Sequence, residues 1–509
     1  MDRIASVLLE FPPVGAQLEG AQYNQAAVQH AKNVEKLLSS QELHNYAHQL
    51  IDHVHPTDHT ISYLGLLVAA HDAGRLTPED LLTKITTFAC TFDSRQIRYF
   101  GKHFSAVLGW ISSGTLFPAS VAVELLTTAL LRLDPSGSMF TSHHLALVKL
   151  AYTTDNIDAA LPILEKDIVF YPSGKKFADS RPPCDPDVPP VGYITVESGL
   201  TQKVSSSDVM QYDLLRGLAF IQRRAWRAAF EALERVVTYP VKDSHACSKI
   251  MVEAHNKWIL VGLLLNGHAP ALPPTTSPGP AKAYTTLSKP YLALARAFEE
   301  RTPDNLRAEF DAVPANVWTE ENNLSLVRLV IRHYQRWQIL NMRHVYTKIP
   351  LSQIRARTQS AETGAPLATD AEVEDLVGQM IQEGMLRGVV EHPDNGEPYL
   401  RFLDEAEGSS SRSSAGAESG EKDGEGTMTE AEFAARMAEA AQRIKGLEPL
   451  VRAANERLGK TKEYIRFLVK EQKEKERAER GAAAGQEYVD SFMAQVEDED
   501  LMMGVASKY

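Results

Sequence analysis

The chain has 509 residues and a formal net charge of −13, from 53 lysines and arginines against 66 aspartates and glutamates. At about 150 residues per domain, this length allows roughly three domains and a sizeable buried core. The acidic balance argues against non-specific nucleic-acid binding, which needs a basic surface. The cysteines Cys90, Cys184 and Cys247 are far apart, which excludes a disulfide framework and a zinc ribbon and fits a reducing compartment.

No targeting or membrane-spanning segment stands out. The apolar residues near the N-terminus are cut short by Glu10 and by Pro12-Pro13, unlike those of a signal peptide. The most apolar stretch, residues 258–265, is well short of the ~20 residues that span a bilayer. We therefore expect a protein of the cytoplasm and the nucleus that does not contact a membrane.

From residue 20 to about 270 the apolar residues recur with a helical period, broken by loops such as residues 171–192. Residues 212–239 predict two antiparallel helices, and small residues such as Gly217 would let them approach closely. This unit resembles a tetratricopeptide-type pair, although no strict period recurs. The pattern predicts a mostly α fold that begins as a helical-repeat (tetratricopeptide-like) solenoid.

Two further helices are predicted beyond this pair. Residues 250–265 indicate a mostly buried helix, followed by a Pro-rich loop over residues 270–280. Apolar residues at spacings of three and four predict a long amphipathic helix over residues 324–341, with Thr319 as its N-cap.

The pattern changes after this helix. Residues 343–349 read as a short strand that leads into a helix at Pro350, and a capping box at Thr369 opens a second helix. Residues 389–391 and 399–402 then flank an Asp-Asn-Gly turn, which is a hairpin signal. The order strand, helix, helix, hairpin predicts a winged helix.

The C-terminal part begins with residues 409–426, which are rich in Ser, Gly and Glu and predict a linker because they cannot bury enough apolar surface. A capping box at Thr429 then opens a helix that Gly446 and Pro449 should bend or split, and residues 471–480 are a solvated charge run. Apolar residues follow nearly heptad spacing along this helix, and we call them the seam. The seam comprises Phe433, Met437, Ile444, Leu447, Val451, Leu458, Ile465 and Leu468.

No catalytic residue, metal site or cofactor is predicted. Residues 53–56, His-Val-His-Pro, resemble the start of a metalloprotease zinc site, but Tyr63 and Leu66 stand where a serine and the aspartate ligand are needed. His44 and His48 lack the glutamate that zinc-protease helices carry between their histidines. Phosphate-binding glycine loops and the Gly-x-Ser-x-Gly motif are missing from the sequence. We therefore expect a protein that is not an enzyme.

Nucleic-acid binding is disfavoured but needs a comparison with protein binding. The exposed face of the second winged-helix helix carries side chains that repel or ignore phosphates: Glu372, Glu374, Asp375, Gln379, Gln382 and Glu383. A basic face on the preceding long helix favours an RNA contact: Arg328, Arg332, Arg336 and Arg343. An acidic protein partner or a solvated helix face explains these arginines equally well.

A helical solenoid that runs into a winged helix resembles the PCI domain, which occurs in scaffold subunits of the proteasome lid, the signalosome and a translation initiation factor. Residues 289–295, 324–337 and above all 345–354 look like the subunit-three family of the COP-nine (COP9) signalosome. The resemblance covers roughly residues 205–405. It implies a non-catalytic scaffold subunit of an assembly that removes a ubiquitin-like modifier from cullins (deneddylation) and so regulates cullin-RING ubiquitin ligases. The proteasome lid and the initiation factor remain alternatives.

The resemblance also implies how such a subunit binds its neighbours. Winged helices of this family join edge to edge, C-terminal helices meet in a bundle, and cullin-RING ligases are contacted indirectly. The seam is the candidate for the bundle. The candidates for the winged-helix edge are Val345, Tyr346, Lys348, Ile349, Val389, Val390 and Tyr399.

These patterns divide the chain into six expected segments. They are an N-terminal solenoid (1–204), a PCI helical subdomain (205–342), a winged-helix subdomain (343–405), a flexible linker (406–428), a C-terminal bundle helix (429–480) and a flexible tail (481–509).

Overall fold

The structure is a computed structural model that describes residues 2–13, 20–172, 181–241, 247–300, 302–393, 396–403, 430–459, 462 and 464–473. The chain divides into two compact units, residues 1–426 and 427–509. The predicted linker, Thr429 and the tail lie outside the described residues. None of the helices in the described ranges has the length and apolar character that crossing a bilayer requires.

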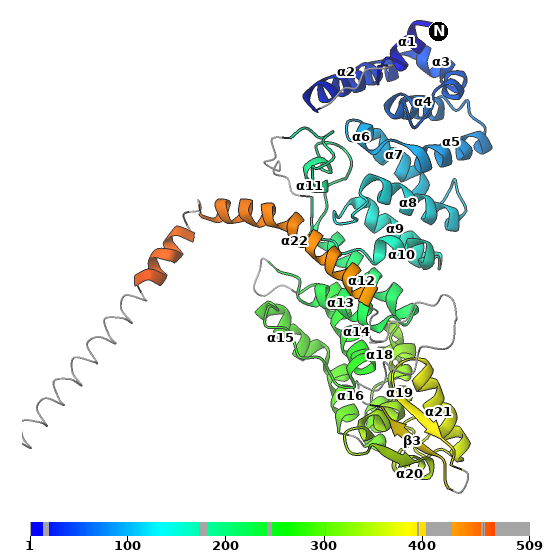
Figure 1. Cartoon of the computed structure of the whole chain (residues 1–509), viewed down its shortest axis with the longest axis vertical. Coiled ribbons are helices and arrows are strands. Elements are labelled where there is room, and N and C mark those ends of the chain that lie inside the picture. The colour runs from blue at the N-terminus through cyan, green and yellow to red at the C-terminus, as the bar shows by residue number, and fades with distance from the viewer. Residues whose placement is uncertain are drawn as a thin grey trace, which may run out of the picture. The chain divides into compact units, whose positions relative to one another are not determined.

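The first unit begins with helices that follow one another in chain order (Figure 1). They are α1 (Asp2–Leu8), α2 (Gly20–Leu38), α3 (Gln41–Leu50), the 3-10 turn η1 (Ile51–His53), α4 (Thr60–Asp72), α5 (Pro78–Thr91), α6 (Ser94–Ile97), α7 (Gly101–Ser112), α8 (Ala119–Leu133), α9 (Ser142–Thr153), α10 (Ile157–Leu164) and α11 (Pro190–Tyr193). The helical part continues through α12 (Ser206–Gln222), α13 (Trp226–Val237), α14 (Lys249–Asn266), α15 (Pro278–Leu287), α16 (Lys289–Glu299), α17 (Pro303–Ala312), α18 (Ala315–Glu320) and α19 (Leu324–Met342). The prediction of a mostly helical chain is confirmed.

The predicted close pair of helices is α12 and α13. A capping box between Ser205 and Asp208 starts α12, since each side chain accepts from the other residue's backbone N–H. The two helices approach at Gly217, where a Cβ atom would lie 3.0 Å from the side chain of Leu233. A side chain at this position would require Leu233 to shift by a few tenths of an ångström, so the absence of one at Gly217 favours the close approach.

Two boundaries differ from the sequence-based expectation. Thr319 lies inside α18, and the N-cap of α19 is Asn323. The Asn323 side chain makes no capping hydrogen bond, and its Nδ2 donates to the Tyr291 hydroxyl at 2.7 Å in a buried polar network. The predicted loop over residues 270–280 ends earlier, because α15 begins at Pro278, where the missing N–H of proline costs a helix nothing.

The first unit ends in a small antiparallel sheet with two helices. Its elements are β1 (Lys348–Pro350), α20 (Leu351–Arg357), α21 (Asp370–Gln382), β2 (Gly388–Glu391) and β3 (Tyr399–Phe402). The strand order is β1-β3-β2, and both pairings are antiparallel. The predicted hairpin of β2 and β3 is confirmed, although its Asp394-Asn395 turn lies outside the described residues.

The prediction of a strand over residues 343–349 was wrong at its start. Val345 lies in a turn that closes α19, with its N–H donating to Met342 O at 3.0 Å, and β1 begins only at Lys348. The helix end therefore overrides the β propensity of Val345 and Tyr346.

The helix α21 follows its predicted signals closely. Thr369 is its N-cap and accepts from Glu372 N at 3.3 Å, while the Glu372 side chain accepts from Ala368 N rather than completing the box. Gly384 ends the helix with φ +75°, a left-handed conformation that glycine adopts without strain. A separate buried cluster then joins the sheet, α20 and α21, and it includes Ile349, Leu351, Ile354, Val373, Val377, Met380 and Leu400.

The second unit contains α22 (Glu430–Gly459) and a further helical stretch over residues 464–473. The expectation was that Gly446 and Pro449 bend or split this helix, and α22 runs through both positions without a break. Figure 1 shows α22 changing direction along its length, as a helix with an internal proline does.

Candidate protein interfaces

The small sheet separates the predicted edge residues onto two faces. Opposite residues of paired strands share a face, so Lys348, Val389 and Tyr399 lie on the outer face, while Ile349 and Val390 point to the core. Ile349 is fully buried, and Val390 is half-buried against the same cluster. The structure therefore places Ile349 in the core and not on a surface that a partner touches.

The outer face carries a polar cluster that crosses all three strands. Arg401 Nε donates to Glu391 Oε1 at 2.5 Å, and the Tyr399 hydroxyl donates to the other carboxylate oxygen. The ammonium of Lys348 lies 5.3 Å from the centroid of the Tyr399 ring. The hydrogen bond from Tyr399, followed by that from Arg401, lowers the pKa of Glu391. This face is thus polar and satisfied within the chain, as expected of a solvated sheet face.

The two edges of the sheet differ in their free backbone groups. Because β3 is the central strand, Tyr399 is not at an edge, and the edges are β1 and β2. Phe402 N donates to Thr347 O and Leu351 N donates to Pro398 O, so Lys348 and Pro350 face away from β3. Pro350 has no N–H, which leaves β1 with a single outward donor.

The same reasoning shows that β2 keeps all its outward N–H and C=O groups. Leu403 N donates to Arg387 O at 3.2 Å, so residues 387, 389 and 391 face β3. Gly388 and Val390 therefore direct their N–H and C=O groups outward from β2. The side chain of Val389, 42% exposed, stands beside this edge. Of the two edges, β2 offers the better template for an added strand.

The turn before β1 adds exposed surface near the other edge. Val345 is 75% exposed, the highest value among the exposed large apolar residues. Tyr346 is half-buried, and the Arg357 guanidinium lies 5.1 Å from its ring centroid and contacts its hydroxyl. Side chains, rather than free backbone groups, dominate this edge.

The seam of the second unit is exposed along its length. Its described side chains are 43–68% exposed: Phe433, Met437, Ile444, Val451, Leu458, Ile465 and Leu468. The side chain of Leu447 is not among those that the structure describes. Sequence reasoning missed Phe467 and Val469, which are 58% and 47% exposed, although both belong to the apolar run Ile465-Arg-Phe-Leu-Val. The seam is therefore a candidate surface for packing against another helix.

The basic face of α19 is partly neutralised within the chain. Arg336 contacts the carboxylate of Glu383 and donates to Gln379 Oε1 at 3.2 Å, both on or next to α21. Arg332 Nε lies 3.7 Å from a carboxylate oxygen of Glu362. Two of the four arginines thus already have carboxylate partners, which weakens the case for an RNA contact.

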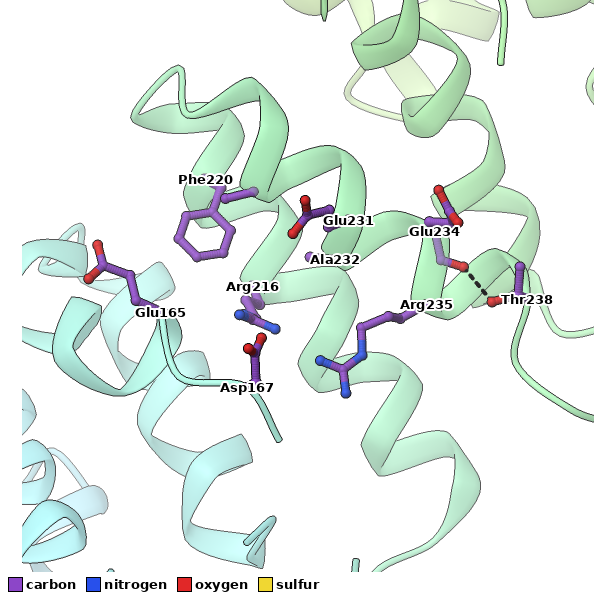
Figure 2. A pocket seen from close by; sticks show the side chains of 10 residues that line it. Glu165, Asp167, Arg216, Phe220, Glu231, Ala232, Glu234, Arg235 and Thr238 are labelled. Atoms are coloured by element: carbon purple, nitrogen blue, oxygen red, sulfur yellow. Dashed lines mark hydrogen bonds between the residues drawn. The ribbon is translucent and has the colours of Figure 1, made fainter. Parts of the chain in front are cut away.

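A cavity of about 390 Å³ lies between the turn after α10 and the helices α12 and α13 (Figure 2). Arg216 is buried, and its Nε donates to Leu164 O at 2.5 Å, while Arg235 Nη2 donates to Ile168 O at 2.8 Å. Burial raises the pKa of Glu234, which lies on the same wall. The two guanidinium groups therefore hold the turn against the helical pair, which is a structural role.

His44, considered above as a zinc ligand, and the buried pair His143 and His144 have structural roles. Among the described residues, no three His, Cys, Asp or Glu side chains come together in an arrangement that could hold a metal ion. His44 Nδ1 lies 3.0 Å from Ser40 O, at the start of α3. His143 and His144 are buried and make hydrogen bonds to Ser105 and Thr141. Burial lowers their pKa values to about 4 and about 3, so both are neutral at pH 7.

The fold and these surfaces define a helical-repeat protein suited to contacts with other proteins. Comparison with known proteins gives the family. A model of the family described as "COP9 signalosome complex subunit 3, N-terminal helical repeats" matches residues 21–278.

Three relatives carry the same name. The chain is 44% identical to COP9 signalosome complex subunit 3 of Neurospora crassa over 99% of both chains. It is 29% identical to the Emericella nidulans protein over 69% of this chain and 72% of that one. It is 27% identical to the Arabidopsis thaliana protein over 42% and 47% of the two chains. The chain belongs to the COP9 signalosome complex subunit 3 family, which makes it a non-catalytic subunit, and the predicted resemblance to this family is confirmed.

Proposed function

We propose that the chain is a scaffold subunit of the COP9 signalosome. In this role it supports the removal of the ubiquitin-like modifier from cullins and so regulates cullin-RING ubiquitin ligases, in the cytoplasm and the nucleus. The observation that carries the proposal is the 44% identity, over 99% of both chains, to a protein named as subunit 3 of that complex. The chain contacts other subunits directly and cullin-RING ligases only through them.

The expected segments fit this role. We propose that residues 1–204 and 205–342 form the solenoid and the PCI helical subdomain, and that residues 343–405 form the winged helix. The element order β1, α20, α21, β2, β3 supports the winged helix, as does the buried cluster that these elements share. Residues 429–480 would be the bundle helix, between the linker (406–428) and the tail (481–509).

The first proposed interface is the edge of β2. A neighbouring strand would pair with the outward N–H and C=O groups of Gly388 and Val390, and Val389 would lie against its side chains. At the β1 edge, Val345, Tyr346 and Lys348 would contact a neighbour through side chains. Ile349 and Tyr399 support these edges from the core and from the central strand.

The second proposed interface is the seam. Large apolar side chains that are about half exposed leave water when they pack against other helices, and this drives association. The near-heptad spacing suits packing against the C-terminal helices of other subunits.

Purification under native conditions tests the assignment. The tagged full-length chain should recover other PCI subunits together with a zinc isopeptidase, and the eluate should deneddylate cullins. Recovery of proteasomal ATPases or of ribosomal subunits instead would move the chain to the proteasome lid or to the initiation factor.

Two proline variants test the interface at β2. Val390→Pro removes an outward N–H from β2, and Lys348→Pro removes the equivalent N–H from β1, while both leave the hydrogen bonds to β3 in place. Val390→Pro should lose winged-helix neighbours, and Lys348→Pro should retain most of them. Circular dichroism of both variants checks that the sheet is folded, and equal losses would contradict the preference for β2.

A further inference from the structure

The connection between α10 and α12 takes a long detour along the N-terminal helices. It spans residues 165–205, far longer than most connections inside a compact unit. Within it, residues 181–204 touch α6 and α2 first, then α8, α7 and α9. We call residues 181–204 the brace.

The N-terminal end of the brace contacts α6 and α2. Arg95 Nε donates to Cys184 O at 3.1 Å, and Arg98 Nη1 donates to Pro183 O at 2.5 Å and to Asp185 O at 3.2 Å. The Cys184 side chain is fully buried, with Sγ 3.3 Å from Gly20 O at the first residue of α2. These bonds satisfy three successive carbonyl groups of the brace.

The middle of the brace is fixed at the end of α8. The buried Tyr193 donates its hydroxyl to Leu133 O at 3.0 Å. The guanidinium of Arg98 lies 3.7 Å from the centroid of the Tyr193 ring, in cation–π contact. Arg98 therefore holds two parts of the brace at once.

The C-terminal end of the brace contacts the first turns of α7 and α9. Ser105 Oγ donates to Gly199 O at 2.6 Å, and a Cβ atom at Gly101 would meet Ser198 O at 2.3 Å, so the two backbones are in direct contact. Thr201 Oγ1 accepts from Ser142 N at 3.1 Å, and Ser142 Oγ accepts from the brace in return.

We infer that the brace couples helices that a solenoid would otherwise leave independent, so that its contacts with α2 and with α9 open together. In repeat proteins each repeat contacts mainly its neighbours, and terminal repeats can therefore open alone. Here one segment binds both α2 and α9, with α6 to α8 between them. Loosening one end of the brace releases contacts at the other end, because a single backbone carries both.

Hydrogen exchange of the full-length chain tests this coupling. Arg98→Ala removes two hydrogen bonds and the ring contact, which is expected to speed exchange roughly tenfold or more in the brace. The same increase should appear in the second turn of α2, since the first four amides of a helix lack helical hydrogen bonds, and at Ser142 N at the start of α9. Arg132→Ala is the matched control, since Arg132 donates to Phe92 O, Cys90 O and Thr91 O and does not touch the brace. Its effect should stay near α5 and α8.

A second variant loosens the C-terminal end of the brace. Thr201→Val removes the hydroxyl that accepts from Ser142 N and should speed exchange at Asp185 and in the second turn of α2. If either variant loosens only the residues next to its own position, the brace does not couple the helices and the inference fails. Parallel increases at both ends, absent from Arg132→Ala, support it.

Discussion

The seam makes the sharpest prediction about assembly. Replacing Ile444, Val451 and Leu458 by serine removes three apolar side chains that are 68%, 55% and 47% exposed in the chain alone. Full burial of such a side chain contributes about 1.5–3 kcal/mol, so burying the exposed half or more contributes ~1 kcal/mol each. The triple variant should therefore lose about 3–4 kcal/mol of binding free energy, which corresponds to two to three orders of magnitude in Kd.

A matched triple variant controls for the helix itself. Serine also lowers helix propensity by a few tenths of a kcal/mol relative to leucine, although it is close to isoleucine and valine. Replacing Lys445, Arg452 and Asn455 by serine carries this cost on the same exposed helix without removing seam side chains. This control should assemble almost normally.

Co-purification at several concentrations of the tagged chain measures the effect. The seam variant should need a far higher concentration to enter the complex than the control variant. Deleting residues 427–480 should weaken assembly further while the first unit stays folded, as a melting curve would show. Equal incorporation of the two triple variants would refute the idea that the seam binds partner helices.

Three further predictions concern the first unit. Ile349→Asp places a carboxylate in the core and should unfold the sheet, whereas Val389→Asp on the outer face should not; circular dichroism compares them, and a folded Ile349→Asp would contradict the assigned core. Thr369→Ala removes the N-cap of α21 and should lower the stability of this helix by about 1 kcal/mol. Hydrogen exchange in the first turn of α21 should become faster, and unchanged exchange would show that the cap does not stabilise the helix. Burial, with a smaller effect of the neighbouring histidine, lowers the pKa of His144 to about 3, so the unfolded chain alone takes up this proton as the pH falls below ~6.5. The contribution of His144 to stability should fall by about 1 kcal/mol from pH 7.5 to 5.5, so urea titrations of His144→Gln should show a smaller fall than those of the unchanged chain.

Local signals predicted much of the fold. The pair α12–α13, the buried α14, the N-cap Thr369 and the β2–β3 hairpin each depend on residues close together in the sequence. Capping groups, glycines and helical periods act within a few residues, so a single sequence displays them. Errors arose where distant contacts decide the outcome. Asn323, for instance, gives its side chain to Tyr291 and not to the helix that it precedes.

The candidate interface was harder to predict than the fold. Alternation shows that neighbouring strand residues face opposite ways, but it does not tell which face is buried. Ile349 and Val389 were therefore expected on one surface, and the register places them on opposite faces. The strand order is likewise invisible in the sequence, so Tyr399 was expected at an edge although β3 is central. The seam was easier, because its spacing lies within a single helix.

The unequal edges of the small sheet also limit how copies of this chain can associate with themselves. A sheet that polymerises needs two competent edges, so that every added molecule presents a new template. Here Pro350 leaves the β1 edge one outward donor, whereas the β2 edge is complete. Two copies that paired through β2 would bury both templates and would expose only the β1 edges. Pro350 thus prevents strands from being added repeatedly at the β1 edge, and it protects the exposed sheet from open-ended aggregation.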